Sequence, residues 1–358
     1  MAIIVNGKKK MIIDRSIPEI VRKLSKFQRE DIFKFMQLLT AFGIDIIEID
    51  MKSVNQVNIL PKNISYAYRV EDEKDVTFIK DYNFRYLIIK NDLAKNMKND
   101  LITNINNSKI ILEINIEKIN DDFWSENYEV LNNFNIACIR INNVEKYNFN
   151  SWSKFIKKIK NEFSVLIDFC PKNRYFAATG IAIECCLDGA DFITTAFYGE
   201  KYGFAASEEV MLALKVIRNG EVIGDSKLLC EIKKVYEKLV DQEIFPMKPV
   251  LGADIFKYES GIHVDGIEKN AKTYEPYNPY EIGSKRQMFI GKHSGKKAVI
   301  TKLKELNIKS INIDVDDLLK EIRSKSVKLR RNILDDELIK LYESSIGKHI
   351  EWGGKYEH

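Results

Sequence analysis

Histidine, the side chain best suited to acid–base chemistry near neutral pH, is rare and unevenly placed in this chain. The four histidines are His263, His293, His349 and His358, so none lies within the first 262 of the 358 residues. No imidazole site for a metal or for proton transfer can form within that part of the chain. His263 and His293 stand in the short motifs S-G-I-H-V-D-G and G-K-H-S-G, which bring further polar groups close to each imidazole.

The earlier part of the chain offers carboxylates and a thiol instead of imidazoles. Asp14 ends a short apolar run, and Asp168 and Cys170 lie two residues apart on an expected strand, where they share one face. Together the three side chains could form a metal site. Lys172 lies close by, however, and an ammonium group that is protonated at pH 7 repels a cation. We therefore do not expect a metal at these residues.

The elements that must position these groups follow a pattern of alternating strands and helices. Strands are expected at 11–14, 44–49, 86–89, 109–116, 135–141, 165–169 and 191–197, and helical patterns separate most of them, as at 30–42, 152–163 and 176–187. This alternation favours parallel β-α-β units. Six or seven such units within about 220 residues predict a (β/α)8 TIM-type barrel rather than an open sheet.

The pattern changes near residue 250. Residues 252–295 are rich in Gly, Tyr, Pro and His, which indicates a connecting lid, and amphipathic helices are expected at 314–329 and 335–345. The sequence thus predicts a barrel over 1–250, a lid/linker subdomain over 251–298 and a small C-terminal helical subdomain over 299–358.

Composition argues against several classes of function. The 56 basic and 52 acidic residues nearly cancel to a net charge of +4, and no basic tract stands out, so nothing predicts a nucleic-acid partner. There is no apolar run of about 18 residues and no signal-peptide pattern, so no membrane role is expected. The five cysteines are odd in number and form no C-x-x-C pair. We expect a cytoplasmic protein with free thiols.

Two segments, ESGIHVDGIEKNAKTYEPYNPYEIG (259–283) and IGKHSG (290–295), resemble the homocitrate synthase and isopropylmalate synthase family. ILDDELIKLY (333–342) is similar to the end of the homocitrate synthases of nitrogen fixation, and weaker similarity covers 43–50 and 185–203. The resemblance implies a Claisen-type condensation of acetyl-CoA with 2-oxoglutarate and water to give homocitrate and CoA. In this family a divalent metal in the barrel polarises the oxo acid.

The metal-binding motifs of that family are largely lost here. The family's D-T-T-L-R-D-G corresponds to DRSIPEI (14–20), which keeps Asp14 but has Pro18 in place of Arg, and H-x-H-N-D corresponds to CPKNR (170–174). Cys170 and Lys172 thus replace both His, and Phe204 replaces the Asn of G-E-R-A-G-N. We expect no cofactor on this chain and no activity by the chain alone.

Two expectations concern the charged residues that remain in the degenerate site. Burial of Asp14 without a cation would be costly, so Lys172 is expected to substitute for the metal charge and to pair with Asp14 or Asp168. Glu48 and Arg140 lie on strands where they can point inward and could remain from substrate binding.

The groups that a family member lends to its neighbour are kept. By resemblance, His263 and Tyr274 complete the active site of an adjacent subunit, and Lys292, His293 and Ser294 are predicted substrate-binding residues. The chain therefore resembles one subunit (omega-type) of a two-subunit nitrogen-fixation homocitrate synthase. The partner would be a family-related catalytic subunit with intact H-x-H-N-D that holds the divalent metal, with acetyl-CoA and 2-oxoglutarate bound at the composite site.

Two alternatives remain open. The chain could be a noncatalytic regulatory or scaffold pseudoenzyme that binds a related synthase without contributing His263. It could also be an unrelated lyase or transferase on a remodelled barrel.

Overall fold

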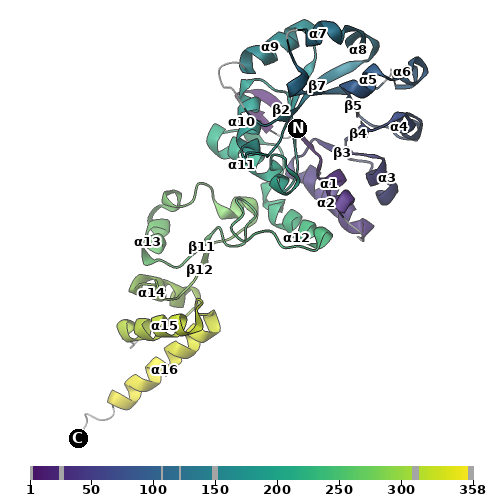
Figure 1. The fold of residues 1–358 in the computed structure, drawn as a ribbon. Helices are drawn as coiled ribbons and strands as arrows, with labels where there is room; N and C mark the ends of the chain where they lie inside the picture. Colours follow the sequence, from purple (N-terminus) through teal and green to yellow (C-terminus); the bar gives the residue numbers. More distant parts are fainter. Residues whose placement is uncertain are drawn as a thin grey trace. The chain divides into compact units, whose positions relative to one another are not determined.

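The computed structural model describes residues 3–353 apart from 24–27, 106–107, 121, 147–151 and 309–313, with side chains up to residue 346. The chain divides into two units (Figure 1). The barrel unit comprises residues 1–244 and 249–251, and the C-terminal unit comprises 245–248 and 252–358. The sequence predicts the corresponding boundary at residue 250.

The barrel unit contains eight parallel strands that close on themselves, which confirms the predicted TIM-type barrel. The strands follow one another in chain order from β2 to β9, and β9 pairs with β2. Their bounds are β2 (Lys8–Asp14), β3 (Ile46–Ile49), β4 (Tyr66–Val70), β5 (Tyr86–Lys90), β6 (Ile110–Asn115), β7 (Ile136–Val144), β8 (Leu166–Pro171) and β9 (Phe192–Thr195). Two short strands, β1 (Ile3–Val5) and β10 (Glu221–Val222), extend the sheet antiparallel at its amino-terminal edge.

Helices surround the strands of the barrel (Figure 1). They are α1 (Ser16–Lys23), α2 (Arg29–Phe42), α3 (Met51–Val57), α4 (Glu73–Phe78), α5 (Asn91–Lys95), α6 (Asn99–Ile105), α7 (Phe123–Glu126), α8 (Tyr128–Asn133), α9 (Trp152–Phe163), α10 (Ala178–Asp188), α11 (Ser207–Arg218) and α12 (Leu229–Val240). The helix expected at 30–42 is α2, which ends at Gly43. Gly43 has a φ of 124° and donates its N–H to the carbonyls of Leu39 and Thr40, as expected of a helix-terminating glycine.

The C-terminal unit is built from short strands and four helices. Its elements are β11 (Lys257–Tyr258), α13 (Gly261–Asn270), β12 (Gln287–Met288), α14 (Lys296–Glu305), α15 (Val315–Leu329) and α16 (Asp335–Gly353). One hydrophobic core joins Val264 and Met288 to Leu303, Leu318 and Leu338. The segments 251–298 and 299–358, predicted as separate subdomains, thus share a core. No helix among the described residues is long and apolar enough to cross a membrane.

Candidate functional site

The interior of the barrel is arranged in layers because residues two apart on a strand point the same way. An apolar layer consists of side chains from most strands, including Ile13, Ile46, Ala67, Ile111, Cys138 and Phe192. Two residues further along the same strands, toward their carboxyl ends, the side chains are Arg15, Glu48, Arg69, Glu113, Arg140 and Thr194. An ionic layer therefore lies directly above an apolar one.

The charged side chains of this ionic layer pair with one another, although Nη2 of Arg140 and Oδ1 of Asp168 are buried without a hydrogen-bond partner among the described residues. Arg140 donates from Nε to Asp168 at 2.5 Å and from Nη1 to Glu48 at 2.7 Å. Arg69 donates from Nε to Glu48 at 2.8 Å and holds Glu113 through two hydrogen bonds of 3.0 and 2.6 Å. The strand register produces these contacts, since Glu113, Arg140 and Asp168 lie side by side on β6, β7 and β8. Glu48 and Arg140 do point inward, but each is fully buried and bound to a neighbour.

The arginines keep Glu48 and Glu113 ionised, whereas burial raises the pKa of Asp168 despite its contact with Arg140. Burial by itself would raise the pKa of Glu48, but the charges of Arg69, Arg140 and Arg15 outweigh it and hold that pKa well below its ordinary value. The pKa of Glu113 falls to about 2 because Arg69 and Arg140 likewise outweigh its burial. The layer is thus a set of paired charges, which leaves little net attraction for a divalent cation.

The positions that would hold a metal form an apolar cluster instead. Cys170, Ala196 and Phe204 pack together in a buried group. The guanidinium carbon of Arg15 lies 4.1 Å from the Phe204 ring centroid, and Lys172 Nζ lies 3.8 Å from it. Burial raises the pKa of the Cys170 thiol and so keeps it neutral. A neutral thiol, a phenyl ring and two cations do not suit a divalent metal.

The expected pairing of Lys172 with Asp14 or Asp168 is wrong. Lys172 lies on the Phe204 ring, while Asp168 accepts hydrogen bonds from Arg140 and from the Thr194 hydroxyl, the latter at 2.7 Å. The physical reason is that Arg140, on the adjacent strand, already neutralises Asp168. Asp14 is held by the Ser16 amide at 2.9 Å rather than by a cation.

A metal site from Asp14, Asp168 and Cys170 is not formed either. Within the described part of the chain, the group of metal-type ligands that lie close enough to share an ion is Glu200, Glu208 and Glu209. Two of these carboxylates accept protein hydrogen bonds, from the Tyr198 amide to Glu208 and from the Thr179 hydroxyl to Glu209, both at 3.1 Å.

We expect Asp14→Asn to stabilise the barrel at neutral pH. Burial raises the pKa of Asp14 to about 6, so this carboxyl favours folding when protonated, and the benefit is lost as pH rises from about 4 through 6. An amide keeps the hydrogen bond from Ser16 and removes the buried charge. Unfolding at pH 7.5 should show a gain of about 1–3 kcal/mol that vanishes near pH 4.

The matched control for this substitution is Asp92→Asn, at an exposed carboxylate paired with Lys118. It should change the free energy of unfolding by less than about 0.5 kcal/mol. Loss of stability in Asp14→Asn at pH 7.5 would show instead that the charge of Asp14 is needed in the folded barrel.

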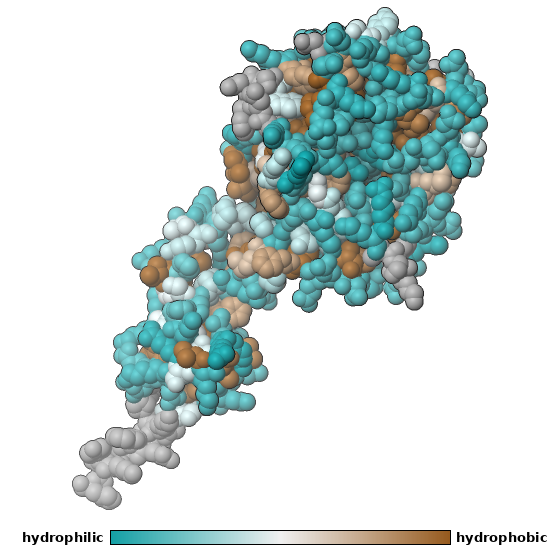
Figure 2. Space-filling view, viewed as in Figure 1, coloured by the Kyte–Doolittle hydropathy of each residue, from teal (hydrophilic) through white to brown (hydrophobic). Residues whose placement is uncertain are grey.

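The C-terminal unit brings His263 and Tyr274 together, as the resemblance implies. His263 lies in the first turn of α13, which Ser260 caps by accepting the Ile262 amide. Its ring centroid is 4.5 Å from that of Tyr274, with 58° between the ring planes. Both side chains reach the surface, Tyr274 with 42% of its area exposed, beside the exposed Ile262. Hydrophobic atoms are visible at the surface beside α13 (Figure 2).

The three residues predicted to bind substrate in the G-K-H-S-G loop differ in exposure. Lys292 and His293 are exposed, and the His293 amide donates to Glu259 at 2.6 Å. Ser294 is fully buried, and its hydroxyl accepts the Gly291 amide at 2.9 Å. The Ser294 hydroxyl is therefore used to close the loop, while Lys292 and His293 face solvent.

Several residues of the barrel interior were not found from the sequence. Arg15, Arg69 and Glu113 are all buried and belong to the ionic layer. The sequence does contain a signal for their inward orientation, because each residue stands two positions after an apolar, inward-facing residue near the end of its strand. That signal depends on the strand boundaries, and β4, which carries Arg69, was missed.

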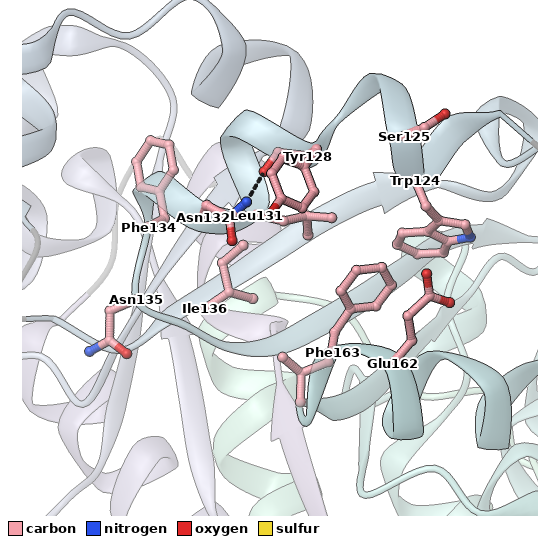
Figure 3. A pocket seen from close by; sticks show the side chains of 11 residues that line it. Trp124, Ser125, Tyr128, Leu131, Asn132, Phe134, Asn135, Ile136, Glu162 and Phe163 are labelled. Carbon is pink, nitrogen blue, oxygen red and sulfur yellow. Dashed lines mark hydrogen bonds between the residues drawn. The ribbon is translucent and has the colours of Figure 1, made fainter.

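A cleft of about 610 Å³ lies near the amino ends of β7 and β8, at the end of the barrel opposite the ionic layer. Figure 3 shows the side chains that line it. The cleft is lined by Trp124, Phe163 and other residues of α7, α8 and α9, and by Asn135 and Ile136 at the start of β7. The rings of Trp124 and Phe163 lie 5.1 Å apart at one end of it. Because this cleft is at the amino ends of the strands, it is distinct from the position where barrel enzymes of this class hold their active sites.

Comparisons with known proteins agree with the geometry. Residues 250–329 match a family model described as homocitrate synthase post-HMGL domain-like. The chain is 45% identical over 346 residues to the homocitrate synthase omega subunit of Clostridium pasteurianum, covering 96% of this chain and 98% of the relative. It is 36% identical over 197 residues to 2-isopropylmalate synthase 2 of Caldanaerobacter subterraneus subsp. tengcongensis, an alignment that spans 54% of this chain and about half (51%) of that protein.

Similarity to solved structures supports the fold alone. The hydroxymethylglutaryl-CoA lyase of Pseudomonas aeruginosa superposes with a TM-score of 0.51 at 11% identity, covering 66% of this chain and 94% of the lyase.

Proposed function

The chain belongs to the homocitrate synthase family, and from that premise we propose that it is one subunit of a two-chain homocitrate synthase. The reaction joins acetyl-CoA and 2-oxoglutarate, with water, to give homocitrate and CoA. The relative from Clostridium pasteurianum is itself named an omega subunit, which supports the existence of a second, different chain.

The observation that carries this proposal is the contrast between the two units. In the barrel unit, Cys170, Lys172 and Phe204 replace groups that would bind a metal. In the C-terminal unit, His263 and Tyr274 are in contact and open to solvent. If the chain had lost its function altogether, substitutions would be expected at His263 and Tyr274 as well as at the metal-binding positions of the barrel.

In this proposal the partner supplies a barrel with intact H-x-H-N-D and its divalent metal, which polarises the oxo acid. His263 of this chain removes a proton from the acetyl methyl group of acetyl-CoA, a task suited to an imidazole. The Tyr274 hydroxyl orients His263 or donates to the oxyanion that develops on the thioester oxygen. Lys292 and His293 contact the CoA side, since both are exposed.

Co-expression with a family member that keeps H-x-H-N-D tests this proposal. We expect the purified chain to form no homocitrate and to show no change in melting temperature with millimolar Mn²⁺ or Mg²⁺, because a ligand that binds the folded state would raise it. The co-purified complex should form homocitrate from the same substrates. Homocitrate formation by this chain alone would contradict the proposal and favour an independent enzyme on a remodelled barrel.

The scaffold alternative also finds support in one observation. The ionic layer is neutralised internally, as expected of a barrel kept for its shape rather than for catalysis. The two roles make opposite predictions for His263: its replacement lowers turnover if it is catalytic and leaves turnover unchanged if the chain is a scaffold.

A further inference from the structure

Gly266 lies one helical turn after His263 on α13, and the space above it is filled by Tyr274. A Cβ atom at Gly266 would lie 2.3 Å from Cε2 and 3.1 Å from Cδ2 of the Tyr274 ring. Such distances are well inside van der Waals contact, so any side chain here would displace the ring. The glycine is therefore needed for space, since a helical backbone places no demand on its conformation.

A partly buried ion pair holds the backbone next to Tyr274. Arg286 donates from Nε and Nη2 to the two carboxylate oxygens of Glu275, at 2.8 and 2.7 Å. Glu275 directly follows Tyr274 and is only 7% exposed, and the two-point contact fixes the orientation of its carboxylate. Both the Tyr274 and Glu275 amides donate to the carbonyl of Ala271, which holds the turn that carries the ring.

We propose that Gly266 and the Glu275–Arg286 pair are positioning residues, which together hold the Tyr274 ring against His263. Gly266 leaves the space into which the ring fits, and the ion pair keeps the ring in that space. The inference rests on the proposed function of His263 and Tyr274 and deepens it.

The helix itself is anchored by other contacts, so the position can be changed without unfolding it. Lys297 of α14 pairs with Asp265 and, at 2.9 Å, with Glu268, and Thr301 donates to Glu268 at 3.2 Å. Alanine is also favoured over glycine within a helix. Gly266→Ala should therefore still fold, with the change confined to the half-exposed Tyr274 ring that the new methyl group displaces.

The first test follows the histidine ring protons by NMR in the full chain. With four histidines in the sequence, each resonance can be assigned by substitution. We expect Gly266→Ala to move the His263 resonance toward its position in Tyr274→Ala, because the ring current of Tyr274 is withdrawn. The matched control is Gly180→Ala in α10, where a Cβ would meet nothing within 4 Å. It should leave the His263 resonance in place.

The second test measures turnover of the complex with the catalytic partner. Gly266→Ala should lower kcat by about 10- to 100-fold with little change in the KM values, as a misplacement of about 1 Å can do. Arg286→Met should act in the same direction, while Gly180→Ala should not.

The outcomes separate this inference from the proposed function. An unmoved His263 resonance in Gly266→Ala would overturn the positioning role, and so would a moved resonance with unchanged kcat. If His263→Ala itself left turnover unchanged, the proposed function would fail, whatever the resonance of Gly266→Ala showed.

Discussion

Replacing His263 with alanine is expected to lower the turnover of the complex by about 10²- to 10⁴-fold, the usual contribution of a general base. The imidazole is exposed in α13 and contacts Tyr274, so its removal takes away a proton acceptor without opening a cavity in the core. The stability of the chain should change by less than about 0.5 kcal/mol. Steady-state kinetics of the co-purified complex measure the effect, with size-exclusion chromatography to show that both chains remain associated.

The control for this substitution is Lys320→Ala in α15 of the same unit. Lys320 is exposed and pairs with its neighbour Asp317 on the same helix, so turnover should be unaffected by its loss. Unchanged turnover in His263→Ala, with the complex intact, would favour the scaffold alternative over a composite active site.

Arg140→Met is expected to destabilise the barrel unit by about 3–5 kcal/mol, because it leaves Asp168 buried without its arginine partner and removes one of the two arginine hydrogen bonds to Glu48. Both carboxylates have no exposed area, so water cannot replace the lost hydrogen bonds. Urea unfolding followed by far-ultraviolet circular dichroism measures the change.

The comparison for Arg140→Met is Lys118→Met, at an exposed ion pair with Asp92. Its removal should cost less than about 1 kcal/mol. Equal stability of the Arg140→Met variant and the wild type would show that the ionic layer contributes little to the barrel, and that its charges are retained for another reason.

Much of the fold follows from residue patterns. The helix expected at 152–163 is α9, with the same bounds, because its apolar residues recur at helical spacing and face the sheet. The strand β4 (Tyr66–Val70) was missed. Its sequence YAYRV mixes aromatic and charged residues, although every side chain in it is buried. The pattern is hidden because Arg69 is buried by ion pairing rather than by apolar packing.

The candidate site was predictable only where a single residue type decides the chemistry. The absence of histidine from the first 262 residues excludes an imidazole ligand there without any knowledge of the fold. The partner of Lys172 could not be predicted, because it depends on the strand register. That register places Arg140 of β7 next to Asp168 of β8, so Arg140 rather than Lys172 pairs with Asp168. The role of Gly266 also depends on tertiary contact, since Tyr274 returns over the helix from eight residues further along the chain.

The division of labour between two subunits can be tested most directly by substituting the lid histidine of each chain in turn. Two complexes are compared, both with a partner chosen from the family to carry H-x-H-N-D and an S-G-I-H motif of its own: one has His263→Ala in this chain, and the other has alanine in place of the partner's S-G-I-H histidine. In the proposal, the partner's histidine would serve the barrel of this chain, where Cys170, Lys172 and Phe204 stand at the positions of the expected metal ligands. We predict that turnover is lost with His263→Ala and kept with the partner substitution. Loss of turnover with the partner substitution, and its survival in His263→Ala, would contradict the composite active site.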